Sequence, residues 1–221
     1  MTHKVFWTEP YRTALTTEVA TVAGTAVTLA STIFYALSGG QESDAGTIGG
    51  HTVQHAQKVG QEIVYTLPAE HGLRVGDVVA VEIDPLRRYR LMRLHFAAEV
   101  VLELVYARCP GVGKVGAHIA ADKARIDFAW PENIAGLFPD LLSAAHALIE
   151  RDLAIESAFS DAALERRYWA VEGFAKVPCG GTHLQRTGEV GRILLRRRNV
   201  GKGKERIEIA LEQPDLPMPV I

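Results

Sequence analysis

Two residues that commonly bind metals, Cys179 and His183, are separated by Gly180, Gly181 and Thr182. A thiolate and an imidazole are ligands that Zn²⁺ prefers in tetrahedral sites. The two glycines allow the backbone to turn, so that both side chains can face one ion. A buried cysteine followed by a glycine turn would give the same pattern, because free cysteine often packs as a small apolar side chain. The segment alone leaves both interpretations open.

A second pair of candidate ligands, His95 and Glu99, lies in a segment with helical periodicity. The two residues are at positions i and i+4 and therefore share one helix face, a spacing that suits two metal ligands. An unrelated histidine and an exposed glutamate would show the same spacing. If all four side chains bind one ion, the zinc ligands are His95, Glu99, Cys179 and His183. Alternatively, Glu99 stands off the metal and, next to His95, takes a proton from metal-bound water.

Two further motifs carry less weight. His51 and His55 repeat the i, i+4 spacing, but they lie outside a helical pattern and without a cysteine or carboxylate nearby, so we predict no metal site there. The glycine-rich run around Lys114 does not have the spacing of a phosphate-binding loop, and no Ser or Thr follows the lysine. We therefore exclude ATP binding at this run.

Six cationic residues are concentrated between positions 196 and 206, with glycines at 201 and 203. A basic hairpin suits an RNA backbone, because phosphate contacts supply most of the affinity; a solvated surface hairpin is the alternative. The formal net charge of the chain is −2, so RNA binding would depend on this local patch. The predicted RNA-binding residues are Arg196, Arg198, Lys202, Lys204 and Arg206.

The elements that must position these residues change in character along the chain. Residues 1–87 read as short strands with glycine-rich connections, which predicts a small β-barrel-like domain. Residues 88–221 mix helices and strands, which predicts an α+β domain with an antiparallel sheet and a metal-binding helix. The predicted strands are residues 14–23, 26–33, 62–67, 77–83, 124–128, 168–174, 191–198 and 206–211. The predicted helices are residues 88–108, 139–151 with Asp140 as N-cap, and 161–167.

Composition limits the cellular setting. Hydrophobic residues make up 48% of the chain and charged residues 23%, which is typical of a globular protein. Two cysteines cannot form a disulfide framework, and the first twelve residues have no apolar run of a signal peptide, so we expect a cytoplasmic protein. The uncharged segment 19–41 is long enough to span a membrane, but its threonines and Gly24 favour two strands around a turn. We expect no membrane association.

In their order, these segments resemble the editing domain of alanyl-tRNA synthetases and its stand-alone relatives, the AlaX proteins. Residues 84–95 resemble the lead into the family's zinc helix, residues 122–128 a strand signature, and residues 179–183 its Cys-x-x-x-His motif, with residues 187–191 and 199–207 continuing in register. The small β-domain indicates the medium-length form. The segment 39–46 resembles the structural loop of the family's β-domain, with matches at Gly39, Gly40, Gln41, Asp44 and Gly46.

Three positions depart from the family pattern. The family's helix motif is His-x-x-x-His, whereas the second position here is Glu99. Phe96 stands where a small hydroxyl residue is usual, and Lys114 aligns with a glutamine near the substrate. With Thr182, these two residues are expected to line the substrate pocket. The change at Glu99 bears on the geometry of the metal site, and the changes at Phe96 and Lys114 bear on which amino acid the enzyme prefers.

The resemblance implies a zinc-dependent trans-editing hydrolase that deacylates mischarged alanine tRNA at its acceptor end, with Ser-tRNA(Ala) and then Gly-tRNA(Ala) as candidate substrates. Such an enzyme is needed because a pocket for alanine cannot strongly reject one added hydroxyl. Two alternatives remain: a tRNA-binding module without catalysis, and a deacylase with another amino-acid preference. No DNA partner is expected. With no ATP site, the chain is not expected to act as a complete synthetase, and the sequence predicts no oligomeric state.

Overall fold

The computed structural model describes residues 2–219, which form two compact units. One unit holds the described residues up to Tyr89 and those from Pro217 onwards, and the other holds Arg90–Leu216. Helix α1 (Pro85–Arg108) begins in the first unit and continues into the second, and the predicted domain boundary between residues 87 and 88 falls inside it. None of the helices within residues 2–219 has both the length and the apolar character needed to cross a membrane.

The first unit is built on a seven-stranded antiparallel sheet with the order β6-β5-β9-β2-β3-β8-β7. The first half of the long strand β2 pairs with β9 and its second half with β3, so the sheet curls along this strand. The strands are β2 (Ala14–Ala23), β3 (Ala26–Leu29), β5 (Gly46–Ile48), β6 (His51–Thr52), β7 (His55–Val59), β8 (Glu62–Thr66) and β9 (Val78–Ile83). The short strands β1 (His3–Lys4) and β4 (Ser31–Thr32) pair in parallel, with the 3₁₀ turn η1 (Val5–Trp7) after β1. Closure of this sheet into a barrel stays a prediction.

The uncharged segment 19–41 forms the strand pair that its threonines and Gly24 predict. The prediction for residues 14–23 is confirmed, because β2 has these bounds. The predicted strand 26–33 is wrong in its length, since β3 ends at Leu29 and β4 begins at Ser31. Between the two strands, Ala30 donates its N–H to the carbonyl of Glu18, and this break lets the chain leave β2 and pair with β1.

The glycine-rich segment after β4 contains three positions that need glycine. Gly39 and Gly40 have φ values of 60° and 87°, in the left-handed region that side chains disfavour. They form a turn closed by two backbone hydrogen bonds between Ser38 and Gln41. At Gly46, a Cβ atom would lie 2.0 Å from a carbonyl oxygen of the facing strand β9. The loop therefore tolerates no larger residue at the point where it enters the sheet.

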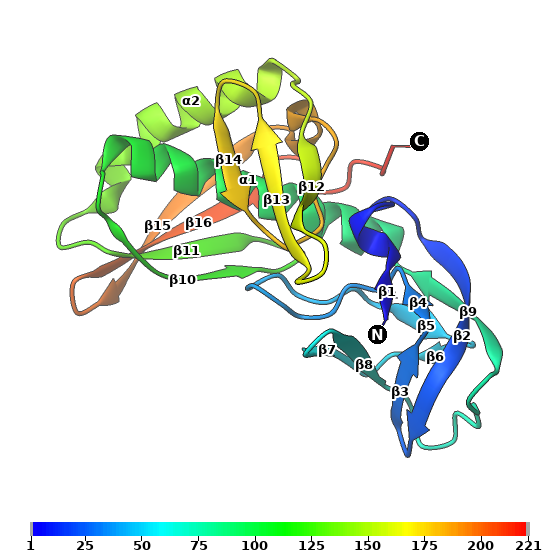
Figure 1. Cartoon of the computed structure of the whole chain (residues 1–221). Coiled ribbons are helices and arrows are strands. Elements are labelled where there is room, and N and C mark those ends of the chain that lie inside the picture. Colours follow the sequence, from blue (N-terminus) through cyan, green and yellow to red (C-terminus); the bar gives the residue numbers. More distant parts are fainter. Residues whose placement is uncertain (1, 220–221) are drawn as a thin grey trace. The chain divides into compact units, whose positions relative to one another are not determined.

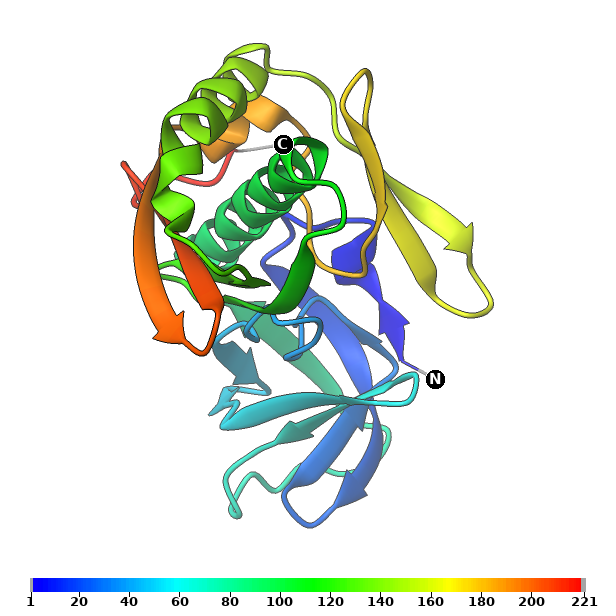
Figure 2. The same cartoon turned by 90° about the vertical axis from the view of Figure 1, so that its left-hand side faces the viewer.

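The second unit combines two antiparallel sheets with α1 and a second helix, so the α+β class is confirmed. Figures 1 and 2 show α1 between the two sheets. The four-stranded sheet has the order β10-β11-β16-β15, and the three-stranded sheet β12-β13-β14. Their strands are β10 (Gly113–Ile119), β11 (Ala124–Ala129), β12 (Glu156–Asp161), β13 (Arg166–Val171), β14 (Ala175–Pro178), β15 (Ile193–Gly201) and β16 (Lys204–Leu211). The other elements are α2 (Phe138–Glu150) and the 3₁₀ turns η2 (Ile134–Leu137) and η3 (Thr187–Val190).

Helix α1 begins three residues before the predicted start at residue 88. Asp84 caps it, because its carboxylate accepts the backbone N–H groups of Leu86 and Arg87 at 2.9 and 3.1 Å, and Pro85 fits the first helical position. The middle of the helix is buried on all sides rather than on one stripe. Arg93 is buried there with its guanidinium bound to the carbonyl oxygens of Val190, Gln213 and Pro214, which satisfies its donors.

Two predictions about the later elements are wrong. Asp140 is not the N-cap of α2, because the helical run starts earlier, at η2, where the side chain of Asn133 accepts the N–H of Ala135. Asp140 lies in the first turn of α2 and binds Arg108 at 2.8 Å. The predicted helix at 161–167 is a turn between β12 and β13. Its residues are good helix formers, but strand pairing on both sides overrides that local preference.

Candidate metal centre and active site

Three side chains from distant parts of the second unit meet at one point. His95 lies on α1, and Cys179 and His183 lie in the loop after β14. One ligand atom from each residue lies within 4.8 Å of the other two, and the Cys179 Sγ is 3.3 Å from the His95 Nε2. Both histidines are buried. The structure therefore brings together two imidazoles and one thiol, which we call the His-Cys-His cluster.

Strand β13 holds the loop that carries two members of the cluster. The N–H of Cys179 donates to the carbonyl of Arg167 at 2.9 Å. The guanidinium of Arg167 in turn donates to the carbonyl of Gly181 at 3.2 Å. Arg167 thus fixes the loop backbone at Cys179 and at Gly181. These two contacts help to hold Cys179 and His183 toward α1.

The ring of His183 is oriented by a contact on only one of its nitrogens. Its Nδ1 lies 3.2 Å from the Ser157 hydroxyl on β12, while its Nε2 is buried without a hydrogen-bond partner among the described residues. Burial lowers the pKa of His183 well below its usual range, and the charges of His95 and Arg167 act in the same direction. The neutral form of His183 is thus favoured, and its Nε2 is the nitrogen left for a ligand.

Glu99 approaches the cluster from the next turn of α1. Its Oε1 is 3.5 Å from the His95 Nε2, and its Oε2 accepts the indole N–H of Trp169 at 3.3 Å. Burial opposes ionisation of Glu99, but the hydrogen bond and charge of His95, the bond from Trp169 and the charge of Lys114 outweigh it and lower the pKa. Burial also opposes a charge on His95, but Cys179 and Glu99 raise its pKa to about 10. Cys179 and Glu99 therefore favour a positive charge at the position of the His95 ring.

The cluster fits a zinc ion by donor type and by distance. Two ligands of a tetrahedral zinc ion, with bonds of about 2.0–2.3 Å, stand roughly 3.5 Å apart, close to the 3.3 Å between the Cys179 Sγ and the His95 Nε2. The unpaired Nε2 of His183 also fits, because a buried polar atom without a partner costs free energy that a metal bond would offset. Ser157 then acts on the other ring nitrogen, the usual way in which a metal-binding histidine is oriented.

Comparisons with known proteins agree over nearly the whole chain. The model of the class II (A) tRNA synthetases matches residues 4–87, and that of the threonyl and alanyl tRNA synthetase second additional domain matches residues 170–208. The alanyl-tRNA editing protein AlaX-M of Pyrococcus horikoshii is 33% identical over 217 residues, which cover 96% of this chain and 99% of that protein. The chain belongs to the AlaX-M family of alanyl-tRNA editing proteins.

Two other relatives show how this family is related to synthetases. The AlaX-M protein of Saccharolobus solfataricus is 30% identical, with 94% of this chain and 98% of that protein covered. The alanine–tRNA ligase of Methanopyrus kandleri is 32% identical, but the match covers only 23% of that ligase. The shared region is thus a whole AlaX-M protein in one case and a part of a larger ligase in the other.

The remaining predicted site residues occupy different settings in the structure. Phe96 is fully buried, with its ring 5.1 Å from that of Trp169, so it belongs to the packed interior. Thr182 is buried between the two loop ligands. Lys114 is exposed on β10, and its charge lowers the pKa of Glu99. The cationic residues predicted to bind RNA lie on the β15–β16 hairpin and are not part of the cluster.

Sequence reasoning missed two residues of this site, Ser157 and Trp169. They pair across β12 and β13 and so share the face of the three-stranded sheet that meets α1. The signal for Trp169 was a large aromatic residue inside the predicted strand 168–174; along β13, its position is one of the buried ones that alternate with less buried neighbours. No such signal existed for Ser157, because its strand was not predicted.

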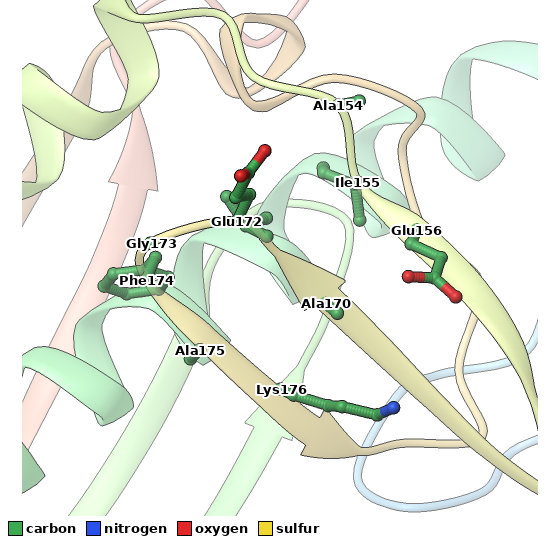
Figure 3. A pocket seen from close by; sticks show the side chains of 10 residues that line it. Ala154, Ile155, Glu156, Ala170, Glu172, Gly173, Phe174, Ala175 and Lys176 are labelled. Carbon is green, nitrogen blue, oxygen red and sulfur yellow. The ribbon is translucent and has the colours of Figure 1, made fainter.

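The opposite face of the three-stranded sheet carries an open cavity of about 630 Å³. Segments 154–156 and 170–176 line it, and its charged side chains are Glu156, Glu172 and Lys176 (Figure 3). Ala170 pairs with Glu156 and with Lys176 across the strands, next to the residues that face α1. None of the cluster residues lines this cavity, so it is separate from the candidate metal centre.

Proposed function

We propose that this protein is a zinc-dependent, cytoplasmic trans-editing deacylase that hydrolyses the aminoacyl ester of Ser-tRNA(Ala), with Gly-tRNA(Ala) as a second substrate. The observation that carries the proposal is the meeting of two imidazoles and one thiol in a chain that aligns end to end with alanyl-tRNA editing proteins. The ester lies at the acceptor end of the tRNA, so the reacting atoms must reach the His-Cys-His cluster.

The metal would be held by His95, Cys179 and His183. When bound, zinc acts as a Lewis acid that polarises an ester carbonyl or lowers the pKa of water. Ser157 fixes the ring of His183 through Nδ1, so that Nε2 faces the site. Because Arg167 holds the loop backbone at two residues, the positions of both loop ligands are set before substrate arrives.

Glu99 is proposed as the proton acceptor beside the metal ligands. Trp169 holds its Oε2, which leaves Oε1 on the side of His95. A carboxylate fixed in this way can take a proton from an attacking water and can later return it to the leaving ribose oxygen. With the Nε2 of His95 bound to the metal, the indole N–H of Trp169 is the donor that holds Glu99 in place. The lowered pKa of Glu99 keeps the carboxylate ionised.

The proposed substrate gives a direct test. We expect the protein to release serine from Ser-tRNA(Ala), to release glycine more slowly from Gly-tRNA(Ala), and to leave Ala-tRNA(Ala) intact, because the site must spare the correct product. Release of labelled amino acid from the three tRNAs, measured under single-turnover conditions, checks this. Hydrolysis of Ala-tRNA(Ala) at the rate of Ser-tRNA(Ala) would contradict an editing role.

A different amino-acid preference is the second candidate, and Lys114 is the observation that favours it. A cationic side chain whose charge acts on Glu99 would favour an amino acid with an acceptor group over a small apolar one. The comparison of seryl, glycyl and alanyl esters separates this candidate from the first. A tRNA-binding module without catalysis would release none of the three.

Replacing Glu99 by glutamine tests its role apart from metal binding. We expect Glu99→Gln to keep the zinc content of the wild-type protein but to lower deacylation by about 10²–10⁴-fold, the usual contribution of a proton acceptor. Glutamine can still accept the Trp169 N–H, so the fold is preserved. Zinc is measured by mass spectrometry and activity with Ser-tRNA(Ala). Loss of zinc together with activity would show instead that Glu99 is a metal ligand.

A further inference from the structure

The four-stranded sheet of the second unit has one apolar face and one charged face. Ile126, Phe128, Ile207 and Ile209 are buried, each at 1% exposure or less. The residues between them on β11 and β16 must point to the opposite side, because successive side chains alternate across a strand. These intervening residues are charged, so that the sheet presents ionic groups on the side away from its core.

Strand register aligns the charged residues in rows across the sheet. In one row, Glu208 on β16 pairs with Arg125 on β11 and with Arg196 on β15. In the next row, Arg206 pairs with Asp127 and with Arg198. Lys204 follows one row further along β16, and Lys123 directly precedes β11. We call the set the charged face: Lys123, Arg125, Asp127, Arg196, Arg198, Lys204, Arg206 and Glu208.

Within this set of described residues, two carboxylates stand against six cations, and the ion pairs leave a positive excess. Asp127 binds both Arg125 and Arg206 at 2.6 Å. Glu208 lies 3.0 Å from Lys123 and 3.8 Å from Arg198.

Two members of the charged face, Arg196 and Lys204, have no ion pair with any described residue, and both are exposed. The neighbouring Arg197 differs, because it binds Glu205 on the apolar side of the sheet at 2.5 Å. Its charge is neutralised away from the charged face.

We infer that the charged face binds the phosphate backbone of the tRNA, an inference that rests on the proposed function for the identity of the RNA. The whole chain has a net charge of −2, so a local excess of four positive charges marks this surface for a polyanion. Cations are spaced about 7 Å along a strand and about 5 Å between strands, which lets one backbone meet several of them. Asp127 orders Arg125 and Arg206, whereas Arg196 and Lys204 supply charge that no carboxylate within residues 2–219 compensates.

The surface therefore extends beyond the basic hairpin that the sequence indicates. It includes Lys123 and Arg125, which lie about 70 residues before the hairpin and join it only through the pairing of β11 with β16 (Figure 1). The structure also divides the hairpin cations into two groups. Arg196 and Lys204 are available for phosphates, while Arg197 holds the sheet together.

The inference is tested with the double variant Arg196→Ala/Lys204→Ala and uncharged tRNA(Ala) as the probe. Fluorescence anisotropy between 50 and 200 mM salt gives the slope of log Kd against log salt. Each lost phosphate contact lowers this slope by about 0.9, so we expect a decrease of up to about 1.8. The matched control is Arg74→Ala/Arg151→Ala, which removes the same charge from exposed residues elsewhere and is expected to keep the wild-type slope.

Other outcomes separate this inference from the proposed function. Equal slopes for the two double variants, or wild-type binding without salt dependence, would overturn the role of the charged face. So would unaltered tRNA binding accompanied by loss of self-association or of binding to an acidic protein. Hydrolysis of seryl-adenosine, which lacks the backbone, should be the same in wild type and variant. If wild type releases no serine from Ser-tRNA(Ala) but the slopes differ as expected, the deacylase proposal fails and the RNA-binding surface stands.

Discussion

Replacing Cys179 by serine is expected to remove zinc from the protein and to lower deacylation of Ser-tRNA(Ala) by about 10³-fold or more. The Cys179 Sγ lies 3.3 Å from the His95 Nε2, and the three donors of the His-Cys-His cluster lie within 4.8 Å of one another. Serine nearly keeps the size of the side chain but replaces the sulfur donor with a hydroxyl oxygen, which is not one of the usual zinc ligands. A Lewis acid contributes several kcal/mol to such reactions, and about 1.4 kcal/mol corresponds to tenfold in rate. Zinc per chain and single-turnover rates provide the measurement.

The chain offers a matched control for this variant. Cys109 is the other cysteine; it is also partly exposed and not in a disulfide, but it lies just after the last residue of α1 and is not part of the cluster. Cys109→Ser should keep both zinc and activity. His183→Ala should behave as Cys179→Ser does, because it removes the unpaired Nε2. A Cys179→Ser protein that retains full zinc and full activity would show that the cluster is not the metal site.

The sequence predicted the residues of the cluster but not the frame that holds them. Both motifs can be recognised in the sequence without knowledge of the tertiary structure: the i, i+4 spacing of His95 and Glu99, and the Cys-x-x-x-His motif. The contacts of Ser157 and Trp169 depend on the register of β12 with β13, which only folding establishes. Phe96 shows another limit: its burial against Trp169 follows from a helix that is buried on all sides, and its place in the substrate pocket stays a prediction.

The fold shows the same division between local and long-range information. Strand β2 was predictable because its alternation runs over many residues. Helix α1 was predictable because it is long, although its middle is buried on all sides and lacks the single apolar stripe that was expected. The three-stranded sheet was not, because its turn at residues 162–165 consists of helix-forming residues and its strand β14 has only four residues. The charged face could not be predicted at all from spacing, since the pairing of β11 with β16 joins segments that are far apart in the sequence.

Replacing Asp44 by asparagine is expected to destabilise the first unit by about 3–5 kcal/mol, the typical cost of leaving one member of a buried ion pair without its partner. Asp44 and Arg88 have no exposed side-chain surface and lie 2.5 Å apart. Asp44 also accepts the N–H of Tyr35 at 2.7 Å, and Arg88 donates to the carbonyls of Pro10 and Ile33. The pair thus joins the start of α1 to two loops of its own unit, the one before β2 and the one between β4 and β5. Amide hydrogen exchange in β2 and β9 should quicken, while exchange in β11 and β16 should not.

A double variant distinguishes the lost pairing from simple loss of packing. In Asp44→Asn/Arg88→Met the buried positive charge is gone and the aliphatic volume is kept, so we expect it to be more stable than Asp44→Asn alone. The opposite order would mean that the hydrogen bonds of Arg88 to the carbonyls of Pro10 and Ile33 matter more than its charge. Arg87→Met is the control, because Arg87 is adjacent in the helix but binds Glu42 at the partly exposed surface, where an ion pair contributes about 0–1 kcal/mol. A large loss of stability is therefore expected when the ion pair of the buried Arg88 is broken, and not when that of the neighbouring Arg87 is broken.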